Sequence, residues 1–210
     1  AFKPRTSPYS FQGLGEKGLE ILAAAREETG LPIVTEVMDV RMVDLVGQYA
    51  DMLQIGSRNM QNFPLLIEVG KTNKPVLLKR GMSASLIEWL CAAEYIALGG
   101  NLDIVVCERG VRCSVSRDYA RNNIDLNVLL PARQACILPV LVDPSHSTGE
   151  AMLVPGASKA AVAAGAQGLI IEVIDDCTEV DCVQCDGEQS IRPGVFAEIV
   201  SEVKGVPQPA

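Results

Sequence analysis

Aromatic residues and histidine are scarce in this chain. Phe, Trp and Tyr together make up 4% of its 210 residues, and the only histidine is His146. No run of apolar residues reaches the length of about 18 that a membrane-spanning helix needs, so we expect no membrane partner. At 48% hydrophobic, the chain can nevertheless bury a large core of Val, Ile, Leu and Ala.

The sequence also lacks an excess of basic residues, with 18 Lys and Arg against 26 Asp and Glu. The formal net charge is −8 and no basic stripe is visible, which argues against a nucleic-acid surface. Seven cysteines without a basic-then-apolar leader suggest reduced thiols and a cytoplasmic protein. The chain begins at Ala1 without a starter Met, so we expect a fragment or a trimmed protein.

Short apolar runs recur at regular intervals. Each is almost continuously apolar, as expected for a parallel strand buried on both faces. These runs cover residues 33–37, 52–55, 76–79, 104–108, 140–143 and 169–173. The segments between them have helical patterns, at residues 14–29, 40–50, 64–70, 126–136, 157–164 and 195–203. A further long helix is expected from a cap at Ser83 or Ser85 to Gly99-Gly100.

This β-α alternation predicts a parallel sheet covered by helices. A (β/α)₈ TIM barrel needs eight strands, so we expect such a barrel lacking its first one or two strands. An open doubly wound sheet is the rival, but no Gly-x-Gly-x-x-Gly or phosphate-binding loop follows a strand. We predict one partial catalytic domain over residues 1–210, with a frayed tail at 205–210.

Charged residues gather at the carboxyl ends of all six predicted strands, the face where α/β proteins build their sites. One set is basic and suits a multiply anionic small molecule, because Arg forks match phosphate and carboxylate. It comprises Lys3, Arg5, Arg58, Lys79 and Arg109, with Arg80 and Arg112 as further candidates. The other set is His146, Glu172 and Asp186, which suits a divalent metal such as Mn²⁺, Fe²⁺, Co²⁺ or Zn²⁺.

A cysteine cluster, Cys177, Cys182 and Cys185, follows the last strand. Its spacing is similar to part of a ferredoxin or zinc pattern, but a fourth ligand is missing. Free thiols on a variable loop are the better interpretation. Proximity to Asp186 in the sequence leaves local metal or redox sensitivity open.

Several segments together resemble one enzyme family, the smaller microbial type I form of 3-deoxy-D-arabino-heptulosonate-7-phosphate (DAHP) synthase. The resemblance runs in order from residue 1 to about 203. The matching segments are Lys3-Pro4-Arg5-Thr6-Ser7-Pro8, Thr35-Glu36-Val37-Met38-Asp39, Gln54-Ile55-Gly56-Ser57-Arg58, Leu78-Lys79-Arg80-Gly81-Met82, Cys107-Glu108-Arg109-Gly110, Asp143-Pro144-Ser145-His146-Ser147, Ile171-Glu172-Val173 and Asp186-Gly187-Glu188-Gln189-Ser190.

The resemblance implies a metal-dependent TIM barrel that condenses phosphoenolpyruvate with erythrose 4-phosphate, opens the shikimate pathway and forms homodimers or homotetramers. It implies phosphoenolpyruvate contacts for Arg58, Lys79 and Arg109, and erythrose-phosphate contacts for Arg5 and Thr6. It also implies metal ligation by His146, Glu172 and Asp186. Lys3 matches the lysine near the reacting centre, and we hypothesise that it passes a proton to the new alkoxide or to water.

The resemblance also implies a fourth metal ligand, a cysteine on a strand that would precede residue 1. Two alternatives remain. The related 3-deoxy-D-manno-octulosonate-8-phosphate synthase takes arabinose 5-phosphate, but it usually carries an Ala-Asn-Arg-Ser type segment where this chain has Lys3-Pro4-Arg5-Thr6. The other is a catalytically silent fragment or paralogue that acts only in assembly.

Overall fold

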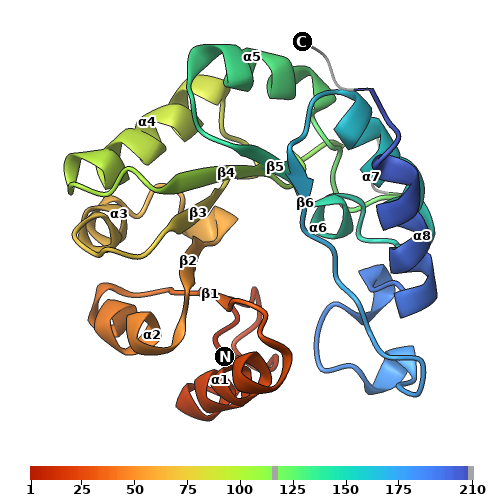
Figure 1. Ribbon diagram of the computed structural model, residues 1–210, viewed down its shortest axis with the longest axis horizontal. Helices are drawn as coiled ribbons and strands as arrows, with labels where there is room; N and C mark the ends of the chain where they lie inside the picture. The colour runs from red at the N-terminus through yellow and green to blue at the C-terminus, as the bar shows by residue number, and fades with distance from the viewer. Residues whose placement is uncertain (115–117, 208–210) are drawn as a thin grey trace. The chain divides into compact units, whose positions relative to one another are not determined.

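The computed structural model describes residues 1–114 and 118–207 (Figure 1). The chain forms two compact units, Ala1–Val106 and Cys107–Ala210. Residues 205–207 follow the last helix without further helix or strand, and the rest of the predicted tail lies outside the described residues. The prediction of one catalytic domain over the whole chain stays a prediction.

The first unit alternates helices and parallel strands. Strand β1 pairs with β2 and β2 with β3, all parallel, and β4 follows β3 in the sheet and continues into the second unit. The helices are α1 (Glu16–Thr29), η1 (Val40–Met42), α2 (Val43–Tyr49), η2 (Ser57–Asn59), α3 (Phe63–Gly70) and α4 (Leu86–Leu98), and the strands are β1 (Val34–Glu36), β2 (Met52–Ile55), β3 (Val76–Lys79) and β4 (Ile104–Glu108).

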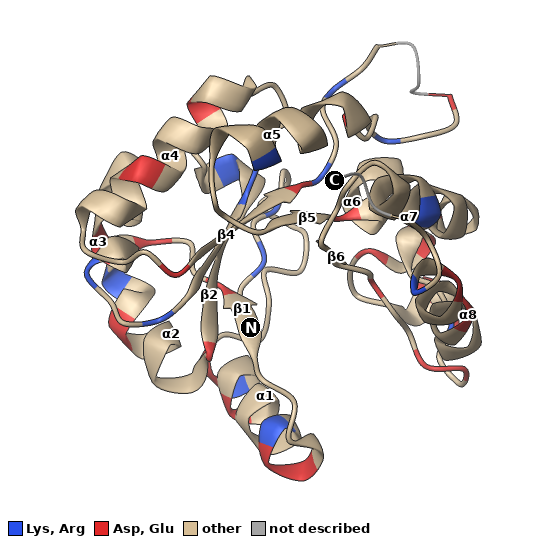
Figure 2. Ribbon diagram, turned by 45° about the horizontal axis from the view of Figure 1, so that its top comes forward, with Lys and Arg blue, Asp and Glu red and all other residues tan. Residues whose placement is uncertain are grey.

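Local signals explain where these helices begin. The Asp39 side chain accepts a hydrogen bond from Arg41 N at the start of η1, and Ser85 forms a capping box with Glu88 at the start of α4. Helix α1 is amphipathic and largely solvated, with charges of both signs on its surface (Figure 2).

Helices α3 and α4 approach each other at backbone distance. A Cβ atom built on Gly70 would lie 2.4 Å from the carbonyl oxygen of Ile96, and one built on Gly99 would lie 2.5 Å from the carbonyl carbon of Gly70. Only glycine fits such a contact. The core beside it contains fully buried Leu66, Trp89 and Ile96.

The second unit continues the alternation, and β5 and β6 pair in parallel. Helices α7 and α8 lie side by side, joined by a 3.1 Å ion pair between Lys159 and Glu202 (Figure 1). Its elements after β4 are η3 (Leu126–Val128), α5 (Leu129–Ala135), β5 (Val140–Val142), α6 (Pro144–Thr148), η4 (Ala151–Leu153), α7 (Val154–Ala163), β6 (Gly168–Leu169), η5 (Val180–Cys182), η6 (Gly187–Gln189) and α8 (Pro193–Val203).

All six predicted strands are present, and each is followed by a helix, which is the alternation of a partial (β/α)₈ barrel. The last strand is shorter than predicted and ends at Leu169. Beyond it the backbone N–H of Glu172 bonds the Ser145 side chain and its carbonyl accepts from Ile191 N, so pairing with β5 stops. Within the described residues, no helix is both long and apolar enough to cross a membrane.

Candidate metal centre

His146 lies on the short helix α6, directly after β5. Asp143 caps this helix by accepting a hydrogen bond from His146 N at its Oδ1 atom, at 2.9 Å. Pro144 occupies the first turn, where its missing N–H costs nothing. The helix ends at Gly149, whose φ of 76° is left-handed. The segment is therefore folded to hold His146 at the end of a strand.

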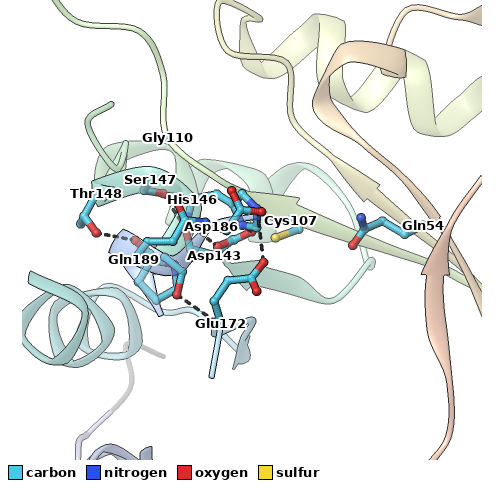
Figure 3. Close-up of polar contacts among 12 residues, drawn as sticks. Gln54, Cys107, Gly110, Asp143, His146, Ser147, Thr148, Glu172, Asp186 and Gln189 are labelled. Carbon is cyan, nitrogen blue, oxygen red and sulfur yellow. Dashed lines mark hydrogen bonds and ion pairs between the residues drawn. The ribbon is translucent and has the colours of Figure 1, made fainter. Parts of the chain in front are cut away.

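The two ring nitrogens of His146 face different carboxylates. Its Nδ1 atom lies 2.8 Å from Oδ2 of Asp143, which is fully buried. Its Nε2 atom lies 3.4 Å from Oε1 of Glu172 and 3.8 Å from Oδ2 of Asp186 (Figure 3). Because Nδ1 is directed at Asp143, Nε2 is the nitrogen available to a metal ion.

Glu172 is positioned by α6. Its backbone N–H donates to the Oγ atom of Ser145 at 3.0 Å, and Ser145 is fully buried. Its backbone carbonyl accepts from Ile191 N at 3.0 Å. The Glu172 side chain is 34% exposed, and its carboxylate points toward His146 and Asp186 (Figure 3).

Asp186 has a left-handed backbone with φ 61°, and it is the one non-glycine residue with positive φ in the described part of the chain. Its carbonyl accepts a hydrogen bond from Ser190 Oγ at 2.8 Å. The side chain is only 10% exposed, and Oδ1 lies 4.0 Å from Nη1 of Arg121. A strained conformation of this kind persists where the surroundings hold it, which is common at functional sites.

The structure thus brings the three predicted ligands together. One ligand atom from each of His146, Glu172 and Asp186 lies within 4.8 Å of the others, and no second group of three potential ligands occurs in the described ranges. One imidazole and two carboxylates fit a divalent transition metal. The three residues would supply one nitrogen and two oxygen ligands.

The cysteines of the following loop do not join this group. Cys177 and Cys182 are exposed and Cys185 is half-buried, and all three are free thiols. Asp175 organises the loop by accepting from the backbone N–H groups of Cys177 and Thr178. A hydrogen bond from the Thr178 hydroxyl, followed by these backbone bonds, lowers the pKa of Asp175. The interpretation as thiols on a loop agrees with this arrangement.

Part of the predicted cation set gathers in the first unit around a carboxylate. Lys79, Lys3 and Arg58 lie close enough to Glu36 to favour its charged form, although burial dominates and raises the pKa of Glu36. The Oε1 atom of Glu36 is buried and has no hydrogen-bond partner among the described residues, and a Cβ on Gly56 would lie 2.1 Å from it.

The remaining predicted substrate residues differ in burial. In the first unit Arg58 Nη2 donates to Thr6 Oγ1 at 3.4 Å, Arg5 is half-buried and Lys79 is 6% exposed. Arg109 is buried in the second unit. Beside it, Glu108 Oε1 accepts from the backbone N–H of Gly110 at 2.7 Å and so fixes the turn that carries Arg109.

Arg80 and Arg112, the two further basic candidates, differ in their surroundings. Arg80 Nε donates to the carbonyl of Ala84, and its guanidinium lies 5.9 Å from the Trp89 ring centroid. It is therefore used in packing at the start of α4. Arg112 is exposed.

The sequence did not predict several residues that support the candidate site. Asp143 and Ser145 stand in the same segment as His146, so a strand end followed by a capping pattern was a usable signal for them. Arg121 and Gln189 are 68 positions apart and gave no local signal for their contact. Glu36 was visible as a charge at a strand end, but its burial among cations was not.

Comparisons with known proteins agree with this architecture. The model of the DAHP synthetase I family matches residues 1–208. Phospho-2-dehydro-3-deoxyheptonate aldolase of Thermotoga maritima is 49% identical over 204 residues, covering 97% of this chain and 59% of the relative. A crystal structure of the same-named Thermotoga maritima protein (DAHP synthase) gives a TM-score of 0.90 at 48% identity, over 97% of this chain and 58% of that one.

A second kind of relative is more distant. The 2-dehydro-3-deoxyphosphooctonate aldolase of Syntrophotalea carbinolica is 34% identical, covering 96% of this chain and 74% of the relative. The order of strands and helices, together with the structural match, defines the chain as a partial (β/α)₈ barrel with a cluster of potential metal ligands. The chain belongs to the DAHP synthetase I family. It spans about three fifths of the length of the Thermotoga maritima relative.

Proposed function

We propose that this chain carries the catalytic machinery for condensing phosphoenolpyruvate with erythrose 4-phosphate to DAHP and phosphate, the first step of the shikimate pathway. The observation that supports this most directly is the clustering of His146, Glu172 and Asp186 within 4.8 Å in a member of the DAHP synthetase I family. The chain is 49% identical to the phospho-2-dehydro-3-deoxyheptonate aldolase but 34% identical to the 2-dehydro-3-deoxyphosphooctonate aldolase. This difference favours erythrose 4-phosphate over arabinose 5-phosphate as the sugar substrate.

The metal-binding residues have the simplest role. His146 would supply Nε2, and Glu172 and Asp186 one carboxylate oxygen each, to a divalent ion such as Mn²⁺, Fe²⁺, Co²⁺ or Zn²⁺. A bound divalent ion supplies Lewis acidity toward the aldehyde carbonyl of the sugar phosphate. Asp143 and Ser145 hold two of these ligands in place.

The basic residues would bind the two anionic substrates. In this proposal Arg58, Lys79 and Arg109 bind the phosphate and carboxylate of phosphoenolpyruvate, since fixed cations stabilise charge as it moves in the reaction. Arg5 and Thr6 bind the phosphate of erythrose 4-phosphate. The enol carbon then forms a bond with the aldehyde carbon, water adds at C2, and phosphate leaves.

Lys3 would act in proton transfer, passing a proton from its ammonium group to the new alkoxide or to water. Lys3→Met keeps the length of the side chain but removes the proton. Positioned acids and bases contribute about 10²- to 10⁴-fold to rate, so kcat should fall by that order while Mn²⁺ affinity stays the same. Unchanged turnover would remove Lys3 from the mechanism.

A phosphate-release assay tests the function as a whole. The chain is incubated with phosphoenolpyruvate and either erythrose 4-phosphate or arabinose 5-phosphate, with Mn²⁺ or with EDTA. We expect release with erythrose 4-phosphate and Mn²⁺ and its loss in EDTA. Release with arabinose 5-phosphate would favour the octulosonate-phosphate synthase, the alternative that the similarity to the 34% identical relative supports. Release with neither sugar, by folded and metal-loaded protein, would support a silent fragment that acts in assembly.

Assembly and location complete the proposal. We expect a homodimer or homotetramer in the cytoplasm, without nucleic-acid or membrane partners. Sedimentation analysis at several protein concentrations measures the oligomeric state directly. A monomer at all concentrations would contradict the proposed assembly and leave the chemistry untouched.

A further inference from the structure

Arg121 and Asn122 lie between β4 and α5, outside the predicted site, yet they are attached to the helix that carries His146. The backbone N–H of Arg121 donates to Thr148 O at 2.7 Å, and that of Asn122 donates to Ser147 O at 2.9 Å. Asn122 is only 4% exposed, and its side chain donates a hydrogen bond from Nδ2 to His146 O at 3.3 Å. This pair of residues is therefore fixed against α6.

Two glycines make this attachment possible. A Cβ on Gly110, where φ is 89°, would lie 2.9 Å from Asn122 Cβ. A Cβ on Gly149, where φ is 76°, would lie 2.7 Å from Arg121 Cβ. Both positions need glycine for the backbone conformation as well as for the space. The close approach is thus built into the sequence on both sides.

From this fixed backbone the guanidinium of Arg121 reaches the third ligand. Its Nη1 atom donates to Oε1 of Gln189 at 2.9 Å and lies 4.0 Å from Oδ1 of Asp186. Gln189 is fully buried and belongs to η6, the turn that directly follows Asp186. The other carboxylate oxygen of Asp186 faces His146 Nε2. The Asp186 carboxylate therefore has Arg121 near one oxygen and His146 near the other.

Asp186 needs such support. Its φ of 61° is unfavourable for a residue with a Cβ atom, and the preceding loop is exposed at Cys177 and Cys182. The guanidinium contacts both Asp186 and the turn after it, so it opposes relaxation of this conformation. Partners outside the ligand set commonly orient metal ligands in this way.

We propose that Arg121 is a positioning residue of the metal centre. Its guanidinium holds Asp186 and η6 in the ligand conformation, and the Arg121–Asn122 pair couples Asp186 to His146. This rests on the proposed metal site. The positive charge of Arg121 also repels a cation, but its side chain is 46% exposed and solvent screens that repulsion, so the positioning effect dominates.

Mn²⁺ affinity measured by electron paramagnetic resonance, without substrate, tests this. We expect Arg121→Met to weaken Mn²⁺ binding about 10-fold, the lower end for loss of an outer partner. Arg121→Lys should recover part of the loss. Arg133→Met is the control, because Arg133 also donates a hydrogen bond from Nη1, in its case to the backbone carbonyl of Gly165 at 3.4 Å, and the substitution should leave Mn²⁺ affinity unchanged.

A double-mutant cycle shows whether Arg121 acts through Asp186. In an Asp186→Asn background, Arg121→Met should weaken Mn²⁺ binding no further. Full additivity of the two losses, or Mn²⁺ affinity that is unchanged or tighter in Arg121→Met alone, would overturn the proposal while the metal site stands. Failure of the wild-type chain to bind Mn²⁺ would overturn the metal site and the role of Arg121 together.

Discussion

Asp143 holds His146 at two points, with one carboxylate oxygen for each. Its Oδ1 atom accepts from the backbone N–H of His146 at 2.9 Å, and its Oδ2 atom lies 2.8 Å from the ring atom Nδ1. One fully buried side chain therefore sets both the backbone of α6 and the orientation of the imidazole. Metal sites in which a carboxylate supports a histidine depend on such pairs.

Replacing Asp143 separates these two contacts. Asp143→Asn keeps an oxygen that can cap the helix but presents no anion to Nδ1, so we expect Mn²⁺ affinity to fall about 10- to 100-fold with little loss of stability. Asp143→Ala should lose the cap as well and destabilise the fold by a further 1 kcal/mol or so. Isothermal titration with Mn²⁺ and urea unfolding measure the two effects. Equal Mn²⁺ affinity in wild type and Asp143→Asn would show that the ring does not need the carboxylate.

Ser145 and Ser147 offer a matched pair of substitutions. Both are fully buried on α6, but Ser145 Oγ accepts from the backbone of Glu172, whereas Ser147 Oγ donates to the carbonyl of Asp143 within the helix region. Ser145→Ala leaves a backbone N–H without its partner, which costs about 1–3 kcal/mol, and it frees the segment that carries Glu172. We expect weaker Mn²⁺ binding for Ser145→Ala alone. Equal loss of Mn²⁺ affinity in both variants would point to a general effect on α6.

Glu36 gives the first unit a distinctive pH dependence. Burial raises its pKa above the ordinary value of 4.5, so the folded protein holds the proton more tightly than the unfolded chain. As the pH rises through 4.5 toward the raised value, the stability of the wild type should therefore fall relative to Glu36→Gln, and the difference should then level off. Urea unfolding of both proteins between pH 2 and pH 8 measures this.

Asp39 provides a control of opposite sign for that measurement. Hydrogen bonds from Arg41 lower the pKa of Asp39 to about 2. Its contribution to stability is present above pH 3.8 and is lost as the pH falls toward 2, so Asp39→Asn should approach the wild type in acid. A difference between Glu36→Gln and wild type that does not vary with pH would contradict the assignment for Glu36.

Two glycines in neighbouring helices should respond to alanine in opposite ways. Gly70→Ala places a Cβ 2.4 Å from the backbone oxygen of Ile96, which cannot move aside, so we expect destabilisation of about 1–3 kcal/mol or more. Gly47 lies inside α2 with nothing within 4 Å of a built Cβ, and Gly47→Ala should stabilise by about 0.5–1 kcal/mol. Thermal unfolding compares them. Destabilisation by both would show that α2 has less room than the structure indicates.

The strands could be predicted because each one is an apolar run bounded by polar residues, and five of the six end within one residue or so of the expected position. The sixth ends earlier than expected because the backbone of Glu172 beyond it bonds Ser145 and Ile191, which are remote in sequence. Helix α7 begins at Val154, earlier than expected, since Pro155 suits a first turn. Local patterns set these elements, and long-range hydrogen bonds set their limits.

The candidate site shows the same division. Strand ends and the family resemblance were enough to predict that His146, Glu172 and Asp186 would meet, and these residues do lie together. The support around them was not predictable. Arg121 reaches Asp186 only because Gly149 lets its backbone approach α6, and no spacing in the sequence encodes that contact. The roles of Lys3, Arg5, Thr6, Arg58, Lys79 and Arg109 stay predictions.

The loop with the exposed Cys177 and Cys182 leaves the site at Glu172 and returns to it at Asp186. An ion held by both carboxylates would act as a cross-link that closes this loop, and a short loop costs little entropy to close. Local opening of the loop should then be rarer in the loaded protein. The rate at which a protease cleaves this loop should therefore report how much of the protein has metal bound. That measurement requires neither phosphoenolpyruvate nor the sugar phosphate.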